Sequence, residues 1–198
     1  MNKNNIDDLI DNLLDSNSTA DEISTITKEF VMLQDRKAIS PLLHRLAYYD
    51  DPYWIRKHLV FALGGLEALE AKEILLDIFF ADETQVELKE ITIIALGYIG
   101  ATEIVVPLME IVKTGKPREL LYASVVALGY IRDPKSIIVL TKALDSEKFL
   151  IPQTAAEALA KFGVAAKQAI PQLQKLVDKG NDAEKHSALD AIAQIRET

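Results

Sequence analysis

A short motif recurs along this chain at nearly constant spacing. Ala-Leu-Gly occupies residues 62–64, 95–97 and 127–129, and weaker copies, Ala-Leu-Ala and Ala-Ile-Ala, occupy 158–160 and 191–193. Their first alanines are separated by 33, 32, 31 and 33 residues. A fixed period of roughly 20–50 residues is typical of stacked repeat proteins, in which each repeat packs on its neighbours. The motif therefore predicts a repeat array.

A second column of residues has the same period. It consists of leucines separated by 33, 33, 32 and 33 residues, namely Leu42, Leu75, Leu108, Leu140 and Leu173. In each repeat we expect a first helix that ends at the Ala-Leu-Gly motif and a second helix that carries the leucine. Second helices are predicted to start near residues 38, 71, 103, 136 and 169. The predicted fold class is all-α, a right-handed α-solenoid of helix pairs.

The two columns also predict the domain organisation. We expect one repeat domain over residues 1–198, with an N-terminal cap helix within 1–18, five helix pairs over 20–179 and a C-terminal cap helix over 183–198. Apolar residues at positions 6, 9, 10, 13 and 14 give the first of these helices one apolar side. Its other side is acidic, as expected where a helix covers one end of an array.

The glycines of the motif indicate close packing. Glycine inside a helix costs about 1 kcal/mol relative to alanine, so it needs a compensating gain. We expect Gly64, Gly97 and Gly129 to lie on the inner side of a first helix, where a side chain would hold the partner helix away.

Composition limits the classes of partner. The chain has no cysteine, which excludes disulfides and thiolate chemistry and fits a reducing compartment. Residues 1–100 carry 18 acidic and 9 basic side chains, whereas residues 101–198 carry 12 and 13. An acidic first half argues against nucleic-acid binding. No run is long and apolar enough to span a membrane, and no apolar segment follows a basic start. We expect a cytoplasmic protein without a membrane or nucleic-acid partner.

Residues able to carry out catalysis or hold a metal do not form a known motif. His44, His58 and His186 fall in different repeats, without a second histidine three or four residues away. Glycine-rich phosphate loops and Gly-x-Ser-x-Gly elbows are absent. Carboxylate pairs at 50–51 and 82–83 lie in turns, where helix capping accounts for them. We predict no catalytic, metal or cofactor residue, and a non-enzymatic role is favoured over an enzyme.

The repeats resemble a known family. Asp51-Pro52, Ile55-Arg56 and residues 62–64 match the pattern of HEAT-like repeats of the short phycobilisome lyase type, as do residues 127–129 with Asp133-Pro134. The resemblance covers about residues 20–196. It implies that the second helices line the concave face and that Arg56 bonds to acidic turn residues. It also implies an alternative function, a bilin lyase or tetrapyrrole-handling chaperone. HEAT-like DNA glycosylases give a third hypothesis, which the acidic first half opposes.

A charged column is predicted along the groove. The positions two residues after the core leucines change from acidic to basic along the chain: His44, Asp77, Glu110, Lys142 and Lys175. The flanking positions include Val106, Ile138 and Pro171. Such a groove would suit an extended or helical segment of a partner protein. The alternative is an ordinary solvated face.

An apolar outer strip is predicted on the first helices of the middle repeats. It consists of Phe61, Ile94, Tyr98, Tyr122, Val126 and Tyr130. The equivalent positions of the last two repeats are polar. A helix that is apolar on both sides is usually covered, either by a partner or by neighbouring helices.

Four aromatic residues cluster around one turn. Tyr48, Tyr49, Tyr53 and Trp54 surround Asp50-Asp51-Pro52. Aromatic side chains of this density form the edge of many interfaces, and they also fill the joints between repeats. The leading functional hypothesis is a non-enzymatic interaction or scaffold module that binds another protein, or a second copy of this chain.

The outer strip can be tested by measuring mass in solution. If the strip mediates self-association, the wild-type chain will be a dimer, and the double change Tyr98→Glu and Tyr130→Glu will make it monomeric, because buried carboxylates oppose the contact. Light scattering measures both masses. A monomeric wild type would instead assign the strip to a different partner.

Overall fold

The structure is a computed structural model that describes residues 6–197. Residues 1–5 of the predicted N-terminal cap segment and residue 198 of the predicted C-terminal one lie outside the described residues. Over residues 6–197 the secondary structure is entirely helical, so the prediction of an all-α solenoid is confirmed. The chain divides into two compact units, Met1–Ile99 and Gly100–Thr198. A single continuous domain stays a prediction.

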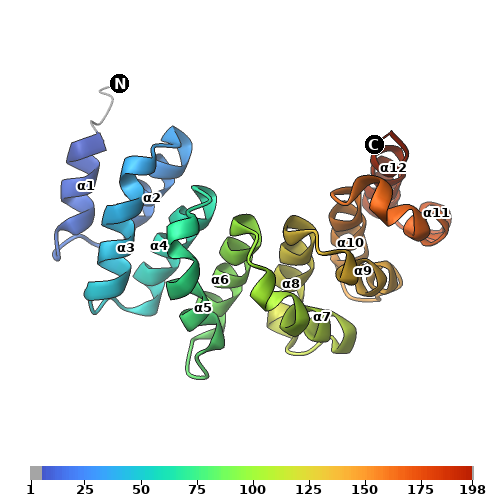
Figure 1. Cartoon of the computed structure of the whole chain (residues 1–198), viewed down its shortest axis with the longest axis horizontal. Coiled ribbons are helices and arrows are strands. Elements are labelled where there is room, and N and C mark those ends of the chain that lie inside the picture. The colour runs from blue at the N-terminus through green and yellow to red at the C-terminus, as the bar shows by residue number, and fades with distance from the viewer. Residues whose placement is uncertain (1–5, 198) are drawn as a thin grey trace. The chain divides into compact units, whose positions relative to one another are not determined.

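In the first unit, first and second helices alternate after an initial helix (Figure 1). The helices are α1 Ile6–Leu14, α2 Ala20–Leu33, α3 Ile39–Tyr48, α4 Tyr53–Gly65, α5 Lys72–Phe80 and α6 Val86–Ile99. The first helices α2, α4 and α6 pack on one another in order, and α3 and α5 pack on α4 and α6. Helix α1 contacts both α2 and α3, so it covers the start of this stack.

The second unit is built in the same way. Its helices are α7 Val105–Thr114, α8 Arg118–Ile131, α9 Ile137–Ala143, α10 Ile151–Ala160, α11 Ile170–Lys179 and α12 Asp182–Glu197. The first helices α8, α10 and α12 stack in order, while the second helices α7, α9 and α11 pack on α8, α10 and α12 respectively.

Every second helix is preceded by a turn of 3-10 helix. These turns are Arg36–Ala38, Leu69–Ala71, Thr102–Ile104, Pro134–Ser136 and Gly163–Ala169. All five predicted starts of second helices fall inside them. The side chains of Asp35 and Asp133 cap two of the turns by accepting from the backbone N–H two residues later, both at 2.9 Å. Because a 3-10 turn is tighter than an α-helical turn, it reverses the chain within few residues, and the α-helix that follows begins on the buried side.

The two periodic columns form the core. The five leucines of the second helices are fully buried, and the first alanines of the five motifs are at most 2% exposed. The period therefore arises because each helix pair places one leucine and one alanine at the same depth in the stack.

The motif glycines allow the first helices to approach closely. A Cβ added to Gly64 would lie 2.7 Å from Cβ of Ala95, and one added to Gly129 would lie 2.7 Å from Cβ of Ala158. The neighbour in both cases is the next first helix. The prediction of close packing at these two glycines is confirmed, and the helix that they contact is the next first helix, because the first helices form their own tightly packed layer.

Replacing Gly129 by alanine tests this packing. The change Gly129→Ala should lower the free energy of unfolding by about 1–3 kcal/mol, because the added methyl group overpacks the contact with Ala158. Helix propensity alone would change the stability in the opposite direction, by about 1 kcal/mol. Urea unfolding measures the sign, and a stabilised variant would contradict the close contact.

Candidate partner-binding surfaces

The second helices of the first unit expose an acidic surface with aromatic residues. His44 on α3 and Asp77 on α5 are both exposed, as predicted for groove positions. The His44 ring lies 5.1 Å from the ring of Tyr48, which is 78% exposed. One helical turn before Asp77, Glu73 is also exposed.

The second helices of the second unit expose apolar and basic residues together. Val106 on α7 is 70% exposed and Ile138 on α9 is 62% exposed. Four residues after these, on the same sides of their helices, lie Glu110 and Lys142, and Lys175 occupies the equivalent place on α11. All three charged side chains are exposed. The side chain of Glu110 pairs with Lys113 at 3.1 Å.

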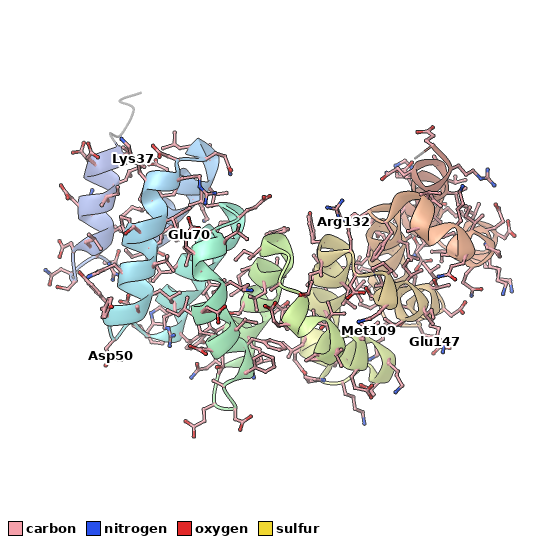
Figure 2. The ribbon with its side chains drawn as sticks, viewed as in Figure 1. Lys37, Asp50, Glu70, Met109, Arg132 and Glu147 are labelled. Carbon is pink, nitrogen blue, oxygen red and sulfur yellow. The ribbon has the colours of Figure 1, made fainter. Side chains whose placement is uncertain are left out.

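A cavity lies beside the second-helix surface in each unit. The one in the first unit has a volume of about 340 Å³ and is lined by Arg56, Asp77, Glu83 and the apolar residues Ile74, Ile78 and Leu88. The one in the second unit has a volume of about 270 Å³ and lies between α7, α9, the loop 145–150 and the start of α10. Figure 2 labels Glu147 in that loop and Met109 on α7.

The outer strip is half-exposed in both units. Phe61 on α4 is 40% exposed and Tyr98 on α6 is 37% exposed. On α8, Tyr122 and Tyr130 are 44% and 39% exposed. Ile94 on α6 and Val126 on α8 are partly buried. Neighbouring side chains cover part of the strip: the ammonium group of Lys161 lies 4.2 Å from the centre of the Tyr130 ring. A strip that continues from one unit to the other stays a prediction.

The aromatic cluster separates into structural and exposed members. The hydroxyl of Tyr49 donates to the carbonyl of Leu14 at 2.6 Å, so this side chain fastens α1 to the end of α3. Tyr53 and Trp54 pack edge to face with ring centres 5.4 Å apart. Trp54 is 52% exposed, and together with Tyr48 it is available to a partner.

A buried arginine beside this cluster was not predicted. Arg45 is 1% exposed and donates two hydrogen bonds to the carboxylate of Asp51, from Nε at 2.8 Å and from Nη2 at 3.0 Å. Its Nη1 donates to the carbonyls of Leu13 and Asp15, at the end of α1. The guanidinium group also lies over the ring of Tyr49, 5.1 Å from its centre.

The role expected for Arg56 therefore belongs to Arg45. Asp51 in the turn bonds to Arg45, and Nε of Arg56 is buried without a hydrogen-bond partner among residues 6–197. A signal for Arg45 was present in the sequence. The equivalent positions of the other repeats are apolar (Ile78, Ile111, Ala143 and Leu176), so an arginine in this column needs a buried partner.

The described part of the chain contains no metal-binding cluster and no candidate membrane span. No group of three or more histidine or acidic residues within 6–197 has a geometry that could hold a metal ion. Burial, reinforced by the charges of Lys28 and Lys57, lowers the pKa of His58 and favours its neutral form. No helix over the same residues is both long and apolar enough to cross a bilayer.

Comparisons with known proteins agree with this architecture. Residues 105–193 match the family model of HEAT repeats. An engineered protein shares 19% identity with the chain, with a TM-score of 0.60 over 96% of each chain. The complex of CpcE and CpcF of phycocyanin lyase from Nostoc sp. PCC7120 gives 20% identity and a TM-score of 0.60, covering 96% of this chain and 81% of that one.

A designed armadillo repeat protein in complex with the peptide (KR)4 is also similar. It shares 16% identity, with a TM-score of 0.58 over 94% of this chain and 98% of that one. At such identities the likeness shows the fold alone. No curated protein matches the chain in sequence. Residues 105–193 thus match HEAT repeats, and the chain has an α-solenoid fold.

Removing the buried arginine should destabilise the first unit. Arg45→Met leaves Asp51 and two carbonyls near the end of α1 without their donor, and breaking a buried pair in this way costs about 3–5 kcal/mol. The matched change Arg56→Met should cost less than about 1 kcal/mol, because Arg56 has no comparable pair. Thermal and urea unfolding measure both. Equal effects of the two changes would contradict the assigned role of Arg45.

Proposed function

We propose that this protein is a non-enzymatic interaction module that binds a segment of a partner protein on its second-helix surfaces. The observation that carries the proposal is the exposure of apolar side chains among charged ones on these helices. Val106 and Ile138 are more than half exposed beside Glu110 and Lys142. Apolar side chains surrounded by charges are a common feature of partner sites.

The fold supports this function. Stacked helix pairs present a row of second helices whose side chains repeat at regular intervals, which suits an extended or helical ligand. The structure of a designed armadillo repeat protein with a similar fold is known in complex with the peptide (KR)4. In the present chain, acidic groups such as Glu73 and Asp77 in the first unit favour basic ligand residues by charge, and Lys142 and Lys175 in the second unit favour acidic ones.

A bilin lyase or tetrapyrrole-handling role is the second candidate. It rests on the phycobilisome lyase-type pattern of residues 51–64 and on the similarity of fold to the CpcE–CpcF complex. Purified protein mixed with a free bilin should then show a shifted absorption band. A spectrum that equals the sum of its components would remove this candidate.

Charge reversal tests the interaction surface. Peptides selected from a random display library against the purified chain should bind about tenfold more weakly after Asp77→Lys with Glu110→Lys, or after Lys142→Glu with Lys175→Glu, because attraction becomes repulsion. Fluorescence polarisation measures affinity, and circular dichroism verifies the fold. Lys28→Glu on the first helix α2 is the matched control. Unchanged binding after all four reversals would overturn the proposed surface.

A further inference from the structure

The two cavities beside the second helices occupy equivalent places in the repeat. Asp77 and Lys142 line them two residues after a core leucine. Arg56 and Leu121 precede their motif alanines by six residues, and Leu88 and Ile151 precede the next ones by seven. Both cavities therefore lie between two consecutive first helices and the second helix that joins them, and the cavity of the second unit is also lined by residues 112–115 at the end of α7.

Their charges are opposite. The cavity of the first unit contains two carboxylates, from Asp77 and Glu83, and one guanidinium group. The cavity of the second unit contains three ammonium groups, from Lys113, Lys142 and Lys148, and one carboxylate, from Asp145. Asp77 and Lys142 occupy the same position in their repeats, so packing does not require their opposite charges. This difference changes the kind of ligand charge that each cavity can hold.

Most of the charges in the second cavity already have partners. Lys113 pairs with Glu110 at 3.1 Å, and Nζ of Lys148 donates to the carbonyl of Gly115 at 2.8 Å. The carboxylate of Asp145 accepts from the amide of Gln172. Within the described residues, Lys142 forms no ion pair. One ammonium group is thus left for a ligand, which matches a single negative charge.

Two exposed apolar residues lie close in sequence to the lysines of this cavity. Ile138 lies one helical turn before Lys142 on α9 and is 62% exposed. Phe149 directly follows Lys148 in the loop before α10 and is 86% exposed. The next residue, Leu150, has a left-handed backbone with φ of 65°, which is unusual for a bulky side chain. The loop thus displays an aromatic ring beside a basic cavity instead of burying it.

We propose that this cavity binds the carboxylate of a glutamate or aspartate in a partner segment. The carboxylate pairs with Lys142 and is supported by Lys148 and Lys113. Apolar neighbours of the acidic residue pack on Ile138 and Phe149. The proposal rests on the interaction function proposed above and names the chemistry of the ligand at one position. The ligand is a singly charged carboxylate rather than a phosphate, because Lys142 is the one ammonium group of this cavity without a partner among residues 6–197.

Matched peptides test the proposal. A fluorescein-labelled peptide with one glutamate between leucines is compared with the same peptide carrying glutamine, in fluorescence polarisation at low salt. The wild-type chain should prefer the glutamate peptide about tenfold. Lys142→Met, which keeps most of the side-chain volume, should abolish this preference. Lys135→Met should preserve it, because Lys135 is exposed in the turn before α9 and does not line the cavity.

Each other outcome has a definite meaning. Equal binding of the glutamate and glutamine peptides, or a preference that survives Lys142→Met, overturns the carboxylate site. Tighter binding of a phosphoserine peptide than of the glutamate peptide also overturns it, in favour of a phosphate site. If library-selected peptides still respond to the charge reversals of the second-helix surface, the interaction function stands without this site. If neither kind of peptide responds, both proposals fail.

Discussion

The first helices of each unit approach so closely that a glycine of one lies against an alanine of the next. An added Cβ would come within 2.7 Å of its neighbour at Gly64 and at Gly129, a distance that real Cβ atoms essentially never show. The contact sets the spacing of the first-helix layer, and the second helices then fill the space beside it. Because each copy must meet the next, the motif recurs with the length of one repeat. The Ala-Leu-Gly motif thus recurs in the sequence because one packing contact between neighbouring first helices recurs in the structure.

At the start of the stack, polar contacts hold the end of helix α1. Helix α1 packs on α2 and α3, and without a donor its last carbonyls would lie buried and unpaired beside α3. Arg45 satisfies two of them and is itself neutralised by Asp51, while Tyr49 satisfies a third. A buried ion pair adds little net stability, but one whose remaining donors cap a helix end also determines where that helix lies. This explains an arginine in a column that is apolar in every other repeat.

The periodic columns made the fold predictable from the sequence. Features that differ from one repeat to the next were hard to interpret. The leucine and alanine columns were sufficient to predict an all-α solenoid, because burial imposes the same residue type on every repeat. The 3-10 turns were missed because they share no capping residue. Asp35 and Asp133 cap two of the turns with their side chains, whereas Ala68 and Ala101 occupy the same position in two others and form no such hydrogen bond. For the surfaces, the sequence indicated which side chains face solvent on the second helices, such as Asp77 and Lys142. It could not reveal the cavities beside them, because their walls combine side chains from several helices and a loop.

The contrast between the two cavities shows how a repeat protein can separate stability from recognition. Positions that face the stack, such as Leu88 and Ile151, are apolar and buried in both cavities. Positions two residues after the core leucine contribute little to packing, so they can change sign at small energetic cost. Asp77 and Lys142 have opposite charges in equivalent surroundings. Two similar cavities thereby have different electrostatic fields, so each favours a ligand group of the opposite charge.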